Sequence, residues 1–214
     1  DKFPLPTLSK KLSEIGYELE CGLGFLLLKG VPVEEYDKDD DIKILYYGMG
    51  LHMGQPVRQN PKGELIGTVI NVGDQANPQT RVYETNAYLP YHSDPTDVVG
   101  LLCIHPAKTG GGSSLISATT LHNEMLNRHP EYLSVLYRPM WYPHVGNEPS
   151  QAPIFSYHEN KLSCRYMRQY LELSHNEMGI PLSPVELEAF DLMDSIMHEN
   201  GIRIDMMMQR GDLQ

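Results

Sequence analysis

The sequence predicts a mainly β domain, a sandwich or barrel with helices inserted between its strands. The chain has 214 residues, of which 41% are hydrophobic and 21% charged, and a chain of this size buries about 70% of its unfolded surface in one core. Short β-branched runs bounded by glycine indicate strands. They are mixed with helical segments but lack regular β-α-β alternation. No repeat or linker interrupts the chain, so we expect one domain over residues 1–214.

The first fifty residues indicate two helices with a strand between them. An amphipathic helix over 8–20 follows from apolar residues at helical spacing, namely Leu8, Leu12, Ile15 and Leu19. The continuous apolar run 24–28 is typical of a buried strand. The acidic run 37–41 predicts the start of a second helix, because carboxylates favour the positive end of the helix dipole. A calcium loop is the less favoured alternative, because its ligands must alternate around a turn glycine.

The middle of the chain supplies most of the expected core strands. Three β-branched or apolar runs indicate strands, at 65–72, 98–104 and 114–117. Two short helices and a hairpin should follow, the helices over 119–127 and 131–137 and the hairpin strands over 154–157 and 162–164.

The clearest local signal lies near the C-terminal end. Ser183 precedes Pro184, and Glu186 stands three residues after the serine, which is the pattern of a capping box with proline at the first helical position. We expect this helix to run to residue 200 and to end at Gly201. A strand over 202–208 should then lead into a turn.

Charge and cysteine content exclude several functions. With 17 Lys and Arg against 28 Asp and Glu, the net charge is −11, so the chain repels phosphate backbones and anionic lipid. We expect no nucleic-acid partner and no membrane association, since no apolar run approaches the roughly 18 residues of a spanning helix. Three scattered cysteines fit a reducing compartment, which indicates a cytoplasmic location.

Common catalytic motifs are absent from the sequence. It contains no Gly-x-Gly-x-x-Gly, no Walker motif and no Gly-x-Ser-x-Gly elbow. Nucleotide-binding folds and serine hydrolases are therefore disfavoured.

One tripeptide, His92-Ser93-Asp94, carries metal-binding chemistry. Residues i and i+2 of an extended segment point to the same side, so an imidazole and a carboxylate can converge on one ion. Pro90 and Pro95 bracket the tripeptide and favour extended backbone. Together with a second histidine, this pair is the ligand set of non-haem iron oxygenases.

Spacing alone leaves the ordinary structural interpretation open. Three other His-x-Glu tripeptides begin at His122, His129 and His175, but they lie in or next to predicted helices, where residues i and i+2 diverge. We interpret those three as surface polar residues. Cys103 alternates within an apolar run and should be buried and inert.

The surrounding sequence resembles the TauD/TfdA family of Fe(II)/2-oxoglutarate dioxygenases. The likeness is carried by the His-x-Asp tripeptide, the apolar run that follows it, and a lysine before a glycine run with serine after it, over 91–104 and 107–117. It extends to the Gly211-Asp212 turn. The resemblance implies a double-stranded β-helix, a jelly-roll barrel with the metal in its mouth.

The resemblance also implies roles for individual residues. His92 and Asp94 would be iron ligands, and Ser114, or alternatively Ser113, would contact the carboxylate of the cosubstrate 2-oxoglutarate. The enzyme would use O₂ to oxidise a small-molecule substrate, most simply by hydroxylation, and would release succinate and CO₂. Homo-oligomers are ordinary for such domains, and the sequence does not decide the oligomeric state.

The family pattern places a second iron histidine about ten residues after the Gly-Asp turn and a 2-oxoglutarate-binding arginine further on. Both positions lie beyond Gln214, so we expect the sequence to be truncated at its C-terminal end. No other histidine or arginine of the chain inherits either role. Two alternatives therefore stay open: an inactive or metal-free binding module on the same fold, and a cupin-like metalloprotein that does not use 2-oxoglutarate.

A few further residues have weaker claims to a functional role. Tyr83, Asn86 and Tyr91 could line a substrate pocket, although packing or turn roles are the more ordinary interpretation. Trp141, Tyr142 and His144 could belong to a lid, but the flanking prolines favour a structural loop.

Overall fold

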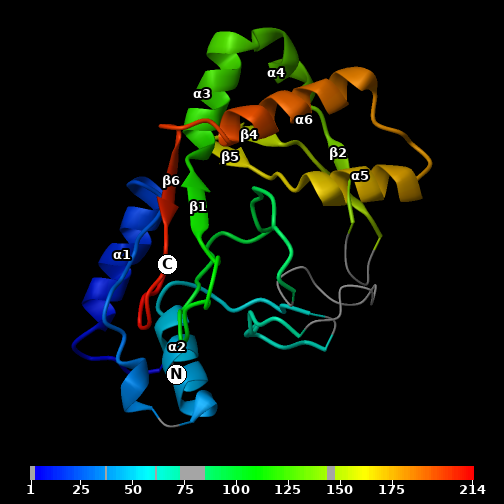
Figure 1. The fold of residues 1–214 in the computed structure, drawn as a ribbon. Helices are drawn as coiled ribbons and strands as arrows, with labels where there is room; N and C mark the ends of the chain where they lie inside the picture. Colours follow the sequence, from blue (N-terminus) through cyan, green and yellow to red (C-terminus); the bar gives the residue numbers. More distant parts are fainter. Residues whose placement is uncertain (1–2, 37, 61, 73–84, 144–147) are drawn as a thin grey trace. The chain divides into compact units, whose positions relative to one another are not determined.

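The computed structural model describes residues 3–36, 38–60, 62–72, 85–143 and 148–214 (Figure 1). The chain divides into two compact units. The first unit comprises Asp1–Thr85, Thr96–Ser113 and Met206–Gln214, and the second comprises Asn86–Pro95 and Ser114–Asp205.

The first unit contains two helices, α1 (Ser9–Cys21) and α2 (Asp39–Gly50), and a short 3₁₀ turn, η1 (Val33–Glu35). Both helices fall where the sequence predicts them. Three carboxylates, Asp39 to Asp41, occupy the first turn of α2, where the helix dipole favours negative charge. The core of this unit consists of Leu12, Ile15, Met49 and Leu213.

The C-terminal segment 211–214 lies between two other stretches of the first unit. Leu28 exchanges two backbone hydrogen bonds with Leu213, and Leu101 exchanges two with Gln214. Gly211 has a φ of 82°, and a Cβ atom there would lie 2.6 Å from the carbonyl oxygen of Val31. Only glycine permits both this conformation and this close approach.

The described part of the second unit contains four helices and two small antiparallel sheets. The helices are α3 (Ala118–Arg128), α4 (Pro130–Leu136), α5 (Arg168–Glu177) and α6 (Pro184–Met197). The sheets pair β2 (Met140–Tyr142) with β3 (Ser150–Ala152) and β4 (Phe155–His158) with β5 (Lys161–Cys164). A buried cluster that includes Met125, Leu136, Phe155, Leu171 and Phe190 forms the core.

Two further strands, β1 (Ser113–Ile116) and β6 (Arg203–Met206), pair with each other, as Figure 1 shows. Strand β6 falls within the predicted strand over 202–208, and β1 overlaps the predicted strand over 114–117 but begins one residue earlier. Each strand runs across a boundary between the two units.

The predicted capping box and hairpin are confirmed. The side chain of Ser183 accepts a hydrogen bond from the backbone of Glu186, and the carboxylate of Glu186 accepts one from the backbone of Ser183. In the hairpin, Glu159 and Asn160 have φ values of 47° and 61°, the left-handed pair that a two-residue turn between twisted strands requires.

The predicted strands over 65–72 and 98–104 are wrong for the described chain. Residues 65–72 form no strand there, and the side chains of Val69, Ile70 and Val72 are exposed. Within 98–104 there is only a single bridge, from Leu102 to Leu213. The run 24–28 likewise contributes only one bridge, at Leu28. A run of this composition becomes a strand only when a neighbouring segment pairs with it by backbone hydrogen bonds. In the described part, each of these runs has at most a single bridge.

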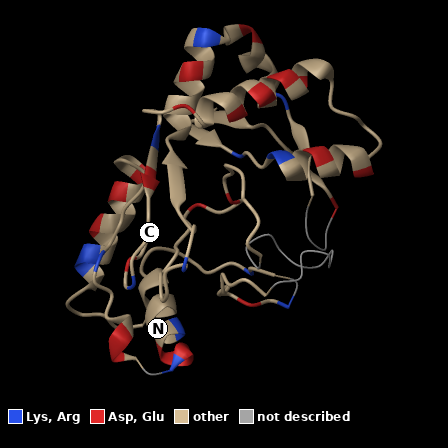
Figure 2. Ribbon diagram, in the orientation of Figure 1, with Lys and Arg blue, Asp and Glu red and all other residues tan. Residues whose placement is uncertain are grey.

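The described residues therefore have mixed helix and sheet content and not the mainly β content that we expected. Their named strands form three sheets of two strands each, and no closed barrel is found among them. Acidic residues lie along α1, α2 and α6 (Figure 2). Among the described helices, none combines the length and apolarity needed to cross a bilayer.

Candidate functional site

His92 and Asp94 lie in the coil segment Asn86–Pro95 of the second unit. The Nε2 atom of His92 is 3.9 Å from Oδ1 of Asp94. The His92 side chain is 21% exposed and that of Asp94 46% exposed. The two groups thus face each other at the edge of the unit, with the imidazole set deeper than the carboxylate.

The backbone sets the tautomer of His92. Its Nδ1 atom lies 2.8 Å from the carbonyl oxygen of Pro90. A carbonyl can only accept a hydrogen bond, so Nδ1 carries the proton and donates it. The Nε2 atom faces Asp94. Metal-binding histidines use this arrangement, in which one ring nitrogen donates to a backbone carbonyl while the other binds the ion.

The separation of the two groups is compatible with a shared metal ion. Two ligand atoms each about 2.1 Å from an ion and at right angles to each other lie about 3 Å apart. The observed 3.9 Å is close enough that a small rotation of the exposed Asp94 side chain would bring its oxygen into range. A neutral imidazole and a carboxylate also suit a ferrous ion chemically. His92 and Asp94 therefore fit an iron ion as two of its ligands.

A third protein ligand is not found in the described part of the chain. No group of three or more His, Cys, Asp or Glu side chains is arranged there to hold a metal ion. The described candidate centre consists of the His92–Asp94 pair.

Ser114, the predicted contact of the cosubstrate, has another partner. It is exposed on β1, and its hydroxyl donates to Oδ1 of Asp205 on β6. Asp205 also accepts a hydrogen bond from Nε of Arg203 at 3.1 Å. The bonds from Ser114 and Arg203 together lower the pKa of Asp205, so its carboxylate is held charged. Ser113, the alternative, is half-buried on the same strand.

The other residues with weaker claims are found in ordinary surroundings. Tyr91 packs edge-on against the ring of His198, with 5.2 Å between centroids. Trp141 and Tyr142 belong to β2, a strand where we expected a loop. Asn86 is exposed. Two others, Tyr83 and His144, lie outside the described residues.

His175 is not the surface residue that we expected. It is only 6% exposed, and its Nε2 atom accepts a hydrogen bond from the backbone N–H of Trp141 at 3.1 Å. Its Nδ1 atom lies 2.8 Å from the carbonyl oxygen of Ile180, so Nδ1 carries the proton. This histidine joins α5 to β2, which makes it a structural residue in the core of the second unit.

A small cavity lies beside His92. The cavity is lined by residues 89–92 and 167–169. Its volume of about 10 Å³ is the space of one water molecule. This cavity is too small to take a substrate.

Ser93 and Tyr166 also belong to the site, although no motif in the sequence marks either of them. Ser93 stands between the two candidate ligands and is hydrogen-bonded through its backbone and side chain to Tyr166. A local sequence pattern cannot predict a contact between residues this far apart in the chain.

Comparison with known proteins places this chain in a family. The model of the taurine catabolism dioxygenase TauD, TfdA family matches residues 1–214. The chain is 33% identical over 220 residues to FR-33289 synthase of Streptomyces rubellomurinus and 22% identical over 228 residues to the taurine hydroxylase-like protein SAT17 of Stachybotrys chartarum. These alignments cover 99% and 100% of the chain but 65% and 58% of the two relatives. The chain thus spans less than two thirds of the length of either relative.

A solved structure shares the fold. It is an asparagine oxygenase in complex with Fe(II), 2S,3S-3-hydroxyasparagine and succinate, and it matches with a TM-score of 0.64 at 15% sequence identity. The match covers 98% of this chain and 70% of that one. At this level of identity the likeness is one of fold.

Proposed function

The chain belongs to the taurine catabolism dioxygenase TauD, TfdA family, and on this premise we propose that it acts as a non-haem Fe(II)/2-oxoglutarate-dependent dioxygenase on a small molecule. The observation that carries the proposal is the pairing of His92 and Asp94, with Nε2 of the imidazole facing the carboxylate and Nδ1 held by the carbonyl oxygen of Pro90. Family membership indicates which metal and which cosubstrate such a pair would serve.

His92 and Asp94 would hold the iron on one side. When bound, iron and 2-oxoglutarate supply the oxidation of a substrate by O₂, with release of succinate and CO₂. His92 contributes a neutral nitrogen ligand whose ring is oriented by Pro90. Asp94 contributes a negative charge that offsets part of the charge of the ion. Ligation by these two residues would leave other coordination positions of the ion for the cosubstrate and O₂.

Ser114 is our candidate for the contact to the carboxylate of 2-oxoglutarate. This role requires its hydroxyl to turn away from Asp205, to which it now donates. Because the carboxylate of Asp205 would repel a second carboxylate nearby, Ser113 stays the alternative. Replacement of each serine by alanine, with the Michaelis constant for 2-oxoglutarate as the measurement, separates the two.

We also propose that the strands described above belong to a double-stranded β-helix. The fold likeness to an oxygenase supports this. The segment 211–214 exchanges backbone hydrogen bonds with residues on either side of it. An inner strand of such a barrel would make bonds of this kind.

The proposal is tested by succinate formation from 2-oxoglutarate in the presence of Fe(II) and O₂. We expect His92→Ala and Asp94→Ala each to abolish it, because each removes one iron ligand. His158→Ala is the matched control, since the side chain of His158 is 88% exposed at the hairpin turn and should leave turnover unchanged. Turnover retained in both ligand variants would refute the assignment. Iron binding without any turnover would favour the alternative of an inactive binding module.

A further inference from the structure

We propose that Tyr166 is a positioning residue for the metal site, and that helix α6 holds it in place through Asp194. The inference rests on the proposed function, because it concerns the alignment of His92 and Asp94 as metal ligands. Every residue involved lies in the second unit.

Two hydrogen bonds hold the middle residue of the tripeptide. The backbone N–H of Ser93 donates to the carbonyl oxygen of Tyr166 at 2.8 Å. In return, the hydroxyl oxygen of Ser93 accepts from the backbone N–H of Tyr166, also at 2.8 Å. Ser93 is flanked on both sides by a candidate ligand, so these two bonds fix the backbone from which both ligand side chains project.

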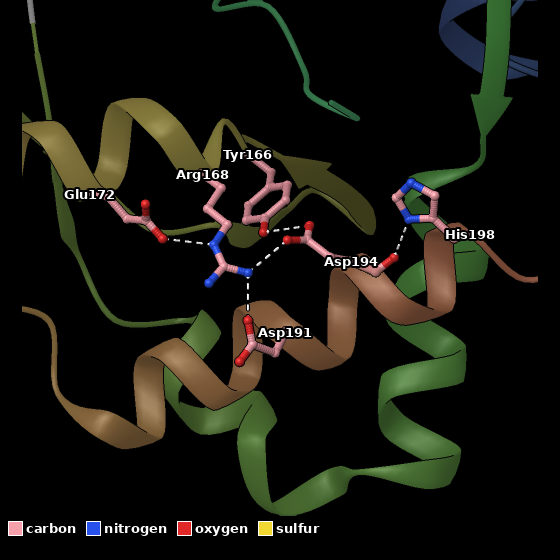
Figure 3. A network of polar contacts seen from close by, with 6 residues as sticks. All are labelled: Tyr166, Arg168, Glu172, Asp191, Asp194 and His198. Carbon is pink, nitrogen blue, oxygen red and sulfur yellow. Dashed lines mark hydrogen bonds and ion pairs between the residues drawn. The ribbon is translucent and has the colours of Figure 1, made fainter. Parts of the chain in front are cut away.

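Tyr166 is itself held by two residues of α6. Its ring is 2% exposed and packs edge-on against Phe190, with 5.9 Å between centroids. Its hydroxyl donates to Oδ1 of Asp194 on α6 at 2.9 Å (Figure 3). Burial and the neighbouring Asp194 raise the pKa of Tyr166, so the hydroxyl keeps its proton and continues to donate.

Asp194 is in turn held by Arg168. Its second oxygen, Oδ2, accepts from Nη1 of Arg168 at 2.8 Å. The same guanidinium donates to Glu172 on α5 and to Asp191 on α6, each at 2.7 Å. Burial would lower the pKa of Arg168, but the bonds to these three carboxylates raise it above its ordinary value. Arg168 therefore stays charged and ties α5 to α6 around Asp194 (Figure 3).

Helix α6 reaches the same segment at a second point. His198, at the end of α6, lies with Nδ1 2.6 Å from the backbone carbonyl oxygen of Asp194, so Nδ1 carries the proton (Figure 3). Its Nε2 atom can then accept from the hydroxyl of Tyr88 at 3.0 Å, and its ring contacts Tyr91. The segment that carries His92 is thus contacted by α6 before the ligand and, through Tyr166, after it.

This arrangement has a direct consequence for metal affinity. Ligands held within about 0.5 Å of their bound geometry need little reorganisation when the ion arrives. Groups that orient metal ligands typically change metal affinity by about 10- to 100-fold when they are removed. Tyr166 and Ser93 are expected to act on affinity in this way without touching the ion.

The test is anaerobic calorimetric titration of the full-length protein with Fe(II). We expect Ser93→Ala to weaken binding about 10- to 100-fold, because it removes the acceptor for the Tyr166 N–H. Ser93→Thr keeps the hydroxyl and should restore affinity. Tyr166→Phe should weaken binding in the same direction but less, since it loses only the bond to Asp194. Tyr137→Phe is the matched control, because it removes a tyrosine hydroxyl that bonds to His122, and it should leave Fe(II) binding unchanged.

Amide hydrogen exchange gives a second readout that needs no metal. In Tyr166→Phe, the Ser93 N–H should exchange at least several times faster, whereas amides within α4 should keep their rates. A merely structural loss would accelerate exchange in both places.

The outcomes separate this inference from the proposed function. If the unsubstituted protein binds no Fe(II), the proposed function fails and with it the role at a metal site, and the exchange rate of Ser93 then tests only whether Tyr166 fixes the backbone of the tripeptide. If that protein binds Fe(II) while Ser93→Ala and Tyr166→Phe bind it equally well, the positioning role is refuted. Should Tyr166→Phe not fold, the Ser93→Ala and Ser93→Thr pair decides.

Discussion

Single side chains show how polar chemistry is built into the core of the second unit. His175 is buried and accepts a hydrogen bond from the backbone of Trp141. Replacement by alanine leaves that N–H without an acceptor and leaves a cavity. We expect His175→Ala to lower the free energy of unfolding by about 1 to 3 kcal/mol, as measured by urea denaturation.

The control for this change is another histidine of the same unit. His158 is largely exposed at the hairpin turn, and His158→Ala should change the unfolding free energy by less than about 0.5 kcal/mol. Equal effects of the two substitutions would show that the buried bond to Trp141 contributes nothing to stability.

The cysteines differ in their expected reactivity. Burial raises the pKa of Cys164 to about 12, so at pH 8 only about one molecule in 10⁴ carries the thiolate that reacts with alkylating agents. Cys21 is exposed. We expect iodoacetamide at pH 8 to label Cys21 rapidly in the native protein and to label Cys164 only after unfolding, as read by peptide mass spectrometry. Raising the pH toward 12 should accelerate labelling of Cys164, and native labelling of both cysteines at the same rate at pH 8 would contradict this.

Among the helices, α6 is the one whose start is most strongly specified. Ser183 accepts a hydrogen bond from the N–H of Glu186 and completes a capping box. Ser183→Ala should therefore cost about 1 kcal/mol of stability, measured by urea denaturation. Ser195→Ala, an exposed serine inside the same helix, is the matched control and should be neutral or slightly stabilising because alanine is the better helix former. A loss of similar size in both would indicate that the cap is not responsible.

Elements with a local signal were predicted, and elements without one were missed. The apolar spacing of α1, the acidic start of α2 and the capping box of α6 are local features, and these helices are confirmed. Helix α5 begins at Arg168, and its N-cap residue, Met167, supplies no side-chain cap, so nothing in the sequence marks its start. Strand β2 is flanked by Pro139 and Pro143, which favoured a loop.

The strand predictions failed for a different reason. The runs 65–72 and 98–104 have the composition of strands, but composition gives no partner. In the described chain, the single bridge of the run 98–104 joins Leu102 to Leu213, which is 111 residues away in the sequence. Pairing over such distances depends on the whole fold and cannot be derived from the run itself.

At the scale of the whole molecule, the site combines one readable feature and one hidden feature. The spacing of His92 and Asp94 was readable because residues i and i+2 of extended backbone share a side. The hydrogen bonds between Ser93 and Tyr166 were hidden because they join positions 73 residues apart. The resemblance to the TauD/TfdA family, in contrast, is confirmed over the entire chain.

The most direct test of the central claim is a titration of the full-length protein with Fe(II) under nitrogen, with and without 2-oxoglutarate. We expect one ion to bind per chain, to bind more tightly when 2-oxoglutarate is present, and not to bind to His92→Ala or Asp94→Ala. Binding that is indifferent to 2-oxoglutarate would favour a cupin-like metalloprotein. Absence of binding, or binding that survives both substitutions, would contradict the assignment of His92 and Asp94 as the iron ligands.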